Sequence, residues 1–202
     1  MAVELEIHEG AAPTEVLPAF YFDLGNPESY LVAERILQMV PVATEWIPVL
    51  GRELPGASIA DALDREALTA TLAARGLQEL RMPDPFPFDS AFAMRAATYA
   101  KQIGRAVPFA LAAFRQCYAA ARGLDVTDNV LIAGSACEMH PTALLKGAEL
   151  RCTHAALAAA TEQAAARGVR AVPAIWVPGD PERVFHGDGS LEDAAVALGA
   201  LV

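Results

Sequence analysis

Residues 20–31 read FYFDLGNPESYL and carry the signals that decide the fold. The segment lies within and just after an apolar, aromatic run at 16–24, which is typical of a buried strand. Asn26 followed by Pro27 is a favourable N-cap and first position of a helix, and Glu28 suits the positive end of the helix dipole. The segment therefore predicts a strand that turns directly into a helix.

A helix and a second strand are expected immediately downstream. Apolar side chains recur at helical spacing through residues 29–40, and Pro41 ends the pattern. Residues 42–50, VATEWIPVL, are rich enough in β-branched and alternating positions to predict a strand. A strand-helix-strand unit favours a parallel pair of strands joined by a right-handed crossover.

The middle of the chain predicts helices only. From about Ser58 to Arg167 it is rich in Ala, Leu and Arg and has almost no β-branched run. Capping residues, glycines and prolines set the expected boundaries: 61–80, Asp89 or Ser90 to Gly104, Pro108 to Gly123, a helix capped by Thr127 or Asp128, and one long or two short helices from the His140–Pro141 break to Gly168.

Strand signals return only near the end, at 174–177 and 183–185. A HGDG turn and a final helix capped by Ser190 follow. The order β-α-β, helical block, β-β-α predicts an α/β fold in which a helical insertion divides a small sheet.

Two domains are expected from this order. Residues 16–57 and 168–202 should form the sheet-containing domain, and residues 58–167 should form the helical insertion, or lid, domain.

Composition narrows the function classes. The 202 residues include 15 Lys plus Arg and 25 Asp plus Glu, a net charge of −10, so nucleic acid and anionic membrane surfaces are unfavourable partners. No apolar stretch approaches the roughly 18 residues of a spanning helix. The acidic start of the chain is the reverse of a secretory signal and predicts a cytoplasmic location.

Cysteine and histidine patterns point away from disulfides and metals. Cys117, Cys137 and Cys152 are an odd set without CxxC spacing, and the four histidines form no HExxH motif. We therefore expect no metal site and interpret the cysteines as small buried hydrophobic residues.

Four patches in this order resemble the thioredoxin-like fold with a helical insertion, and specifically the DsbA family. They are FYFDLGNPESYL, FDSAFAMRAATYAKQIG, GVRAVPAIWV and VFHGDGSLEDA. Within that family the chain looks most like 2-hydroxychromene-2-carboxylate isomerases and kappa-class glutathione transferases. The resemblance implies a thioredoxin-like domain built from the two outer segments.

The helix start is where the resemblance places the chemistry. Dithiol members of the family carry CPxC there, but this chain has Asn26, Pro27, Glu28 and Ser29, so disulfide exchange at this position is excluded. The isomerase and kappa-class relatives place a Ser at the position of Asn26, where it holds the thiolate of bound glutathione. The resemblance implies that the Asn26 amide holds a thiolate or oxyanion and that Ser29 adds a hydroxyl. The alternative is that Asn-Pro-Glu is simply a good helix start.

Two further segments complete the implied site. Val172–Pro173 stands where the fold keeps a cis-proline, which implies that the bond faces Asn26 and that the Val172 backbone pairs with a thiol peptide. In the HGDG turn Gly189 occupies the position of the relatives' ammonium-binding Asp, and Asp188 is the neighbouring carboxylate. Alternatively, Pro173 starts a strand and Asp188–Gly189 is an ordinary turn.

The resulting expectation is an isomerisation or group transfer on a small aromatic or carboxylate substrate, assisted by glutathione or another low-molecular-weight thiol. Expected roles are catalytic for Asn26 and Ser29, and cofactor-binding for Pro27, Val172, Pro173, Asp188 and Ser190. A non-catalytic thioredoxin-like binding or scaffold protein is the alternative, and a thiol-disulfide oxidoreductase is third. Relatives are often dimers, and the Ala-rich helices could supply the face of a homodimer.

Overall fold

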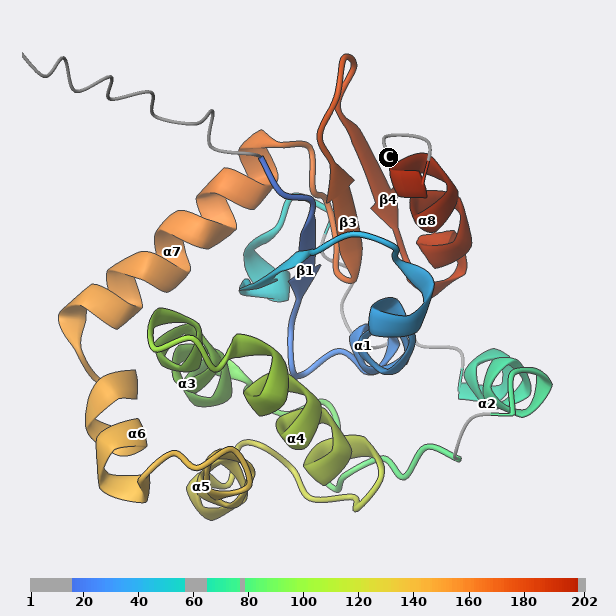
Figure 1. Cartoon of the computed structure of the whole chain (residues 1–202). Coiled ribbons are helices and arrows are strands. Elements are labelled where there is room, and N and C mark those ends of the chain that lie inside the picture. Colours follow the sequence, from blue (N-terminus) through green and yellow to red (C-terminus); the bar gives the residue numbers. More distant parts are fainter. Residues whose placement is uncertain (1–15, 57–64, 77–78, 200–202) are drawn as a thin grey trace, which may run out of the picture.

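The computed structural model describes residues 16–56, 65–76 and 79–199. In chain order its elements are β1 (Ala19–Phe22), α1 (Pro27–Met39), β2 (Glu45–Pro48), the 3₁₀ helix η1 (Gly51–Glu53), α2 (Arg65–Ala74), α3 (Ala91–Gln102), α4 (Ala106–Tyr118), α5 (Thr127–Ser135), α6 (Pro141–Ala148), α7 (Arg151–Ala166), β3 (Ala174–Val177), β4 (Arg183–His186), the 3₁₀ helix η3 (Asp188–Ser190) and α8 (Leu191–Gly199) (Figure 1). The predicted order of strands and helices is confirmed.

The four strands form one sheet in the order β2-β1-β3-β4. β1 and β2 are parallel, with Phe20 opposite Trp46, as the strand-helix-strand pattern predicts. β3 is antiparallel to both β1 and β4, and it places Ile175 opposite Phe20. Residues distant in sequence therefore meet in the centre of the sheet.

The two faces of the sheet are covered by different helices. Phe20 and Phe22 face a large core shared with α1, α3, α4 and α8. Tyr21 and Trp176 face a smaller core under α7, which crosses the other side of the sheet (Figure 1). This alternation follows from the two-residue period of a strand, and it explains why a continuous apolar run is needed in β1.

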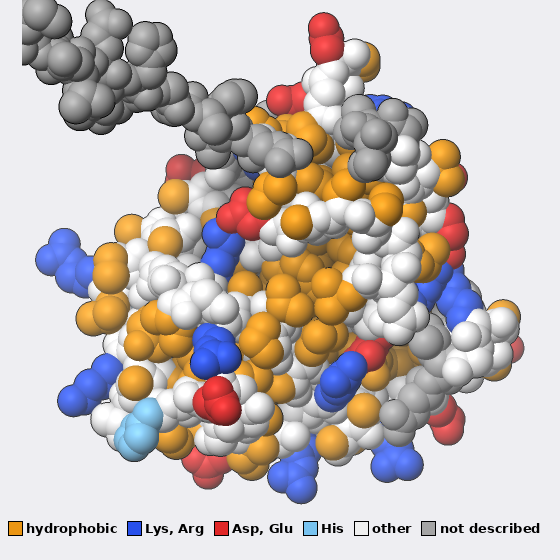
Figure 2. Space-filling model, in the orientation of Figure 1, with side chains coloured by type: hydrophobic (Ala, Val, Ile, Leu, Met, Phe, Trp, Pro, Cys, Tyr) orange, Lys and Arg blue, Asp and Glu red, His pale blue; other side chains and the backbone are white. Residues whose placement is uncertain are grey.

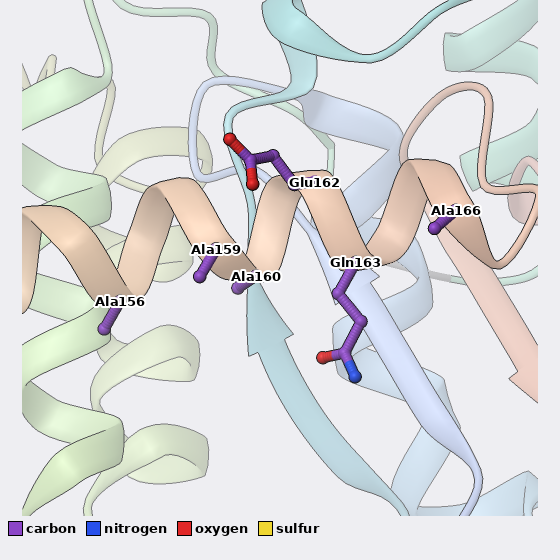
Figure 3. A pocket seen from close by; sticks show the side chains of 6 residues that line it. All are labelled: Ala156, Ala159, Ala160, Glu162, Gln163 and Ala166. Atoms are coloured by element: carbon purple, nitrogen blue, oxygen red, sulfur yellow. The ribbon is translucent and has the colours of Figure 1, made fainter.

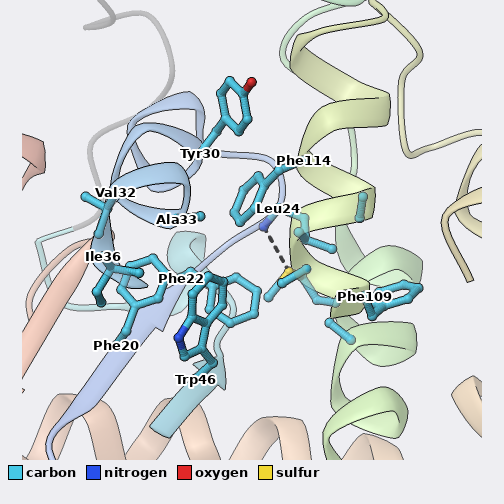
Figure 4. Packing of buried hydrophobic residues seen from close by; sticks show 14 of the residues in the cluster. Phe20, Phe22, Leu24, Tyr30, Val32, Ala33, Ile36, Trp46, Phe109 and Phe114 are labelled. Atoms are coloured by element: carbon cyan, nitrogen blue, oxygen red, sulfur yellow. Dashed lines mark hydrogen bonds between the residues drawn. The ribbon is translucent and has the colours of Figure 1, made fainter. Parts of the chain in front are cut away.

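An aromatic cluster joins the sheet to the inserted helices (Figure 4). The Phe22 ring lies 6.0 Å from the Trp46 ring and 5.8 Å from the Phe114 ring of α4. The Leu24 N–H donates to the Sδ of Met94 in α3 at 3.1 Å. The insertion and the sheet thus share one core.

The chain enters and leaves the insertion at neighbouring points. The Gly56 N–H donates to the carbonyl of Arg170 at 2.7 Å, which joins the segment after η1 to the segment before β3. The expected domain boundary at 57 and 58 lies outside the described residues, as does the end of the expected domain at 202.

Several expected element boundaries are wrong, and the ends of two helices have a local reason. The helix expected over 61–80 is described from Arg65 and ends at Ala74, because Gly76 adopts a positive φ of 62°. The helix expected over 108–123 is α4, which starts before Pro108 and ends at Tyr118. Ala121, with φ of 56°, excludes a helix to Gly123.

The strands expected over 16–24 and 42–50 are four residues long, as β1 and β2. Two helices, α6 and α7, follow Pro141. None of the helices in the described ranges combines the length and apolar character needed to cross a membrane.

Candidate functional site

The start of α1 presents one side-chain donor. The Oδ1 atom of Asn26 accepts a hydrogen bond from the Ser29 N–H at 2.7 Å, and Pro27 occupies the first turn. With Oδ1 engaged as the cap, the Asn26 NH2 group is left as a potential donor, and it donates to no residue in the described part of the chain. Asn26 thus combines the N-cap role with an available donor.

Asp23 is a residue of this site that the sequence patterns did not single out. Its buried carboxylate accepts from the Gly25 N–H at 2.8 Å and from the Gly51 N–H at 2.9 Å, and also from the Ser90 hydroxyl. Burial raises the pKa of Asp23, and these three donors oppose that rise. The signal that could have identified it is an acidic residue inside an otherwise apolar run.

Glycine at position 51 lets the Val172 loop approach Asp23. A Cβ on Gly51 would lie 2.8 Å from the Cγ2 of Val172 and 3.3 Å from the Oδ2 of Asp23. The Val172–Pro173 peptide bond is cis. In the described ranges the N–H and carbonyl of Val172 make no hydrogen bond, so both are available to another chain or ligand.

The last turn closes the same region. The Gly187 N–H donates to the carbonyl of Pro173 at 2.9 Å, and the Asp188 N–H donates to the carboxylate of Glu28 in the first turn of α1. The structure therefore brings the start of α1, the Val172–Pro173 loop and the 186–190 turn together, although they are far apart in sequence. The roles predicted for these residues stay predictions.

Asp188 does not present a free carboxylate. Its Oδ1 pairs with Arg35 of α1 at 3.1 Å, and its Oδ2 pairs with Arg75, just after α2. Glu192 shares the Arg35 guanidinium. An ammonium group that binds Asp188 would have to share the carboxylate with these two arginines.

Ser29 and Ser190 lie differently from what the sequence predicts. Ser29 is fully buried, and its hydroxyl has no hydrogen-bond partner among the described residues, so it is an interior group and not a surface donor beside Asn26. The Ser190 hydroxyl donates back to the carbonyl of His186 at 2.7 Å, within its own turn. In this arrangement neither hydroxyl is presented to a bound molecule.

Glu28 is an unusual carboxylate for a helix start. Burial raises the pKa of Glu28, and the negative charge of Asp188 raises it further, against the lowering effect of the Asp188 N–H. The sequence predicts only a favourable contact with the helix dipole. The surroundings of Glu28 thus hold a second negative charge, that of Asp188, which the sequence pattern at the start of α1 does not indicate.

Three other charged or thiol side chains, Lys101, Arg95 and Cys117, are engaged within the fold. Lys101 pairs with Glu45 at 2.6 Å and Arg95 pairs with Glu149 at 2.8 Å. Burial raises the pKa of the Cys117 thiol to about 12, which makes it unreactive. Three aromatic side chains of α4, Phe109, Phe114 and Tyr118, are buried.

The surface shown in Figure 2 and the hollow on α7 add no residue to the candidate site. On the face shown in Figure 2 hydrophobic side chains gather over the centre, and most Lys and Arg side chains are separated from one another. An open hollow on α7 is lined by Ala156, Ala159, Ala160, Glu162, Gln163 and Ala166 (Figure 3). It includes none of the predicted site residues.

No protein-family model and no curated protein matches the sequence. Three solved structures are similar over most of the chain. A 2-hydroxychromene-2-carboxylate isomerase has 16% identity and a TM-score of 0.73, covering 92% of this chain and 96% of that one. A probable DsbA oxidoreductase from Streptomyces coelicolor has 17% identity and a TM-score of 0.73, covering 91% and 88%.

The third is the cytosolic disulfide reductase DsbM from Pseudomonas aeruginosa with GSH, at 12% identity and a TM-score of 0.67, covering 92% and 98%. At these identities the similarity shows the fold alone. The predicted thioredoxin-like fold with a helical insertion is confirmed.

Proposed function

We propose that this chain binds a low-molecular-weight thiol such as glutathione, with the sulfur at the start of α1. The observation that carries the proposal is the Asn26 amide, whose oxygen caps the helix while its NH2 group has no partner among the described residues. A helix N-terminus stabilises an anion, and an amide donor adds a directed hydrogen bond to it. A similar fold has been solved with GSH.

The chemistry that fits is addition of the bound thiolate to a small aromatic or carboxylate substrate, followed by isomerisation or transfer, in the cytoplasm. Asn26 would hold the thiolate, and the unpaired backbone of Val172 would align the backbone of the thiol peptide. Disulfide exchange does not fit, because neither sulfur of a CPxC motif is present at Asn26 and Ser29.

A second candidate, a non-catalytic thioredoxin-like binding protein, is favoured by one observation. Both oxygens of Asp188 already pair with arginines of the protein itself, so the ammonium of a γ-glutamyl group would have to compete with them. The two candidates differ in whether a thiol binds at Asn26.

Titration calorimetry and thermal shift with glutathione separate the candidates. Ligand at 100 times Kd should stabilise the protein by about 2.7 kcal/mol. Asn26→Asp preserves the N-cap but replaces the donor with a negative charge, so it should abolish binding, whereas Asn26→Ser keeps both a cap and a donor. Gln163→Glu on the exposed face of α7 is the control for an added charge.

S-methylglutathione is the ligand control, because it cannot form a thiolate. Binding that survives Asn26→Asp, or that is equal for the methylated ligand, would exclude a thiolate site at Asn26. No stabilisation by any thiol would favour the binding-protein candidate.

A further inference from the structure

One imidazole accepts a backbone hydrogen bond at the loop that carries Val172. The Nε2 atom of His186, the last residue of β4, accepts from the Arg170 N–H at 3.0 Å. This bond needs a lone pair on Nε2, and a protonated imidazole has donors at both nitrogens and no acceptor. The neutral ring of His186 therefore makes a bond that the protonated ring cannot make.

Arg170 carries the hydrogen bonds that hold the start of this loop. One residue earlier the chain is still bonded to the last turn of α7. The N–H of Arg170 is held by His186, and its carbonyl accepts from the Gly56 N–H at 2.7 Å. The next anchor is Pro173, whose carbonyl accepts from the turn after β4 at 2.9 Å. Between these anchors the backbone of Val172 is unpaired among the described residues, so the Arg170 bonds determine where it lies.

The surroundings of the imidazole favour its neutral form. Burial lowers the pKa of His186 below its ordinary value of 6.5, and the positive charge of Arg170 lowers it further. The other charged side chains of β4 and of the elements packed against it contact other groups or are exposed: Asp188 and Glu192 pair with Arg35, Glu28 accepts from the Asp188 N–H, Arg183 lies over the Phe185 ring, and Asp193 is exposed. The bond to Arg170 is thus present at pH 7 and is lost as the pH falls below 6.5, through the folded-state pKa.

We propose that His186 is a positioning residue of the thiol site, which holds the Val172 backbone in place through Arg170, and that protonation of its ring releases the loop and weakens thiol binding. The inference rests on the proposed function and adds a regulation of that site by pH. His186 itself need not touch the ligand, because it acts through the loop.

Calorimetry with glutathione between pH 7.5 and pH 5 tests this in three proteins. His186→Gln supplies an acceptor oxygen that does not titrate, so it should bind like the wild type at pH 7.5. His186→Phe keeps a ring without an acceptor and should bind about three- to tenfold more weakly at pH 7.5, the effect of one backbone hydrogen bond. At pH 5 the wild type should lose a similar factor relative to His186→Gln. Ionisation of the ligand thiol cancels in this ratio, because both proteins receive the same ligand.

His140→Asn is the matched control. The Nδ1 of His140 also accepts a backbone N–H, that of Thr142 at 3.2 Å, but at the start of α6 in the insertion. This variant should bind glutathione like the wild type at every pH. A ratio of wild type to His186→Gln that stays constant with pH, or wild-type affinity in His186→Phe, would overturn the role of His186 while the thiol site stands.

Hydrogen exchange of the Arg170 amide, followed by NMR without ligand, separates the two proposals. Its protection factor, which corrects for the intrinsic effect of pH on exchange, should fall toward pH 5 in the wild type and stay constant in His186→Gln. Constant protection in both proteins would overturn the role of His186 alone. If glutathione does not bind the wild-type protein at any pH, the thiol site and the role of His186 in it both fail.

Discussion

The Oδ2 atom of Asp23 accepts a hydrogen bond from the Gly51 N–H at 2.9 Å, and this bond fixes the end of β1 against the loop after β2. The second carboxylate oxygen holds the Gly25 N–H at 2.8 Å, one residue before Asn26. A single buried side chain thus sets the relative positions of the start of α1 and of η1, which follows β2. Its carboxylate is costly to bury, so we attribute its presence to this geometry and not to stability.

Replacing Gly51 with alanine should destabilise the protein by about 1–3 kcal/mol, because the added Cβ would lie 2.8 Å from Val172 Cγ2 and crowd Asp23. Chemical denaturation measures the loss. Gly199→Ala is the control, since its Cβ would meet no atom of the described residues within 4 Å, and a change within about 0.5 kcal/mol is expected there. Equal effects of the two changes would show that the approach of Val172 to Gly51 is not tight.

Glu28→Gln should reveal how much the negative charge of Glu28 lowers the free energy of unfolding. The folded state raises the pKa of Glu28 above its ordinary value of 4.5, through burial first and then the charge of Asp188. Its contribution to stability is therefore fully present below 4.5 and is lost as the pH rises through the folded-state pKa. The glutamine keeps an acceptor for the Asp188 N–H without the charge.

Wild-type protein should accordingly gain stability relative to Glu28→Gln as the pH falls from 7 toward about 4. Urea unfolding of both proteins at several pH values measures this difference. Glu162→Gln on α7 removes the same charge far from Asp188 and serves as the control. A difference that stays constant, or that grows in favour of glutamine at low pH, contradicts the assignment.

Asp188→Asn should destabilise the protein by about 2 kcal/mol or more, because it leaves Arg35 and Arg75 without their shared anion. The loss should fall below the roughly 3–5 kcal/mol of a fully buried pair, since Arg75 is 25% exposed. Glu192→Gln removes the 48% exposed partner of Arg35 and should cost less than about 1 kcal/mol. Similar losses in both variants would mean that Asp188 is not central to the network.

Local sequence patterns predicted the elements well where one segment carries the whole signal. Asn26 and Pro27 indicated the start of α1, and residues 174–177 coincide with β3. The resemblance supplied the rest of the site, because only it linked the segment around Val172 to the helix start.

The contacts that define the site could not be read from local patterns. Asp23 bonds to Gly51, 28 residues away, and Asp188 pairs with Arg35 across 153 positions. Periodicity and capping say which residues are buried or begin a helix, but they do not say which distant partner a buried carboxylate finds. The ion pair of Asp188 with Arg35 and the burial of the Ser29 hydroxyl both follow from such tertiary packing.

The hydrogen bond from Gly56 to Arg170 closes the inserted segment into a loop whose two ends touch. Connectivity alone would allow a short linker to replace the helices between them without moving a strand, because the two ends of the insertion already meet and a short loop can close over that distance. Packing imposes the opposite condition, since Phe22 and Trp46 would then lose the cover of Phe114 and its neighbours. The insertion is thus separable from the sheet in connectivity but shares its core. Substitutions where the two pack together should therefore change the stability of the whole protein.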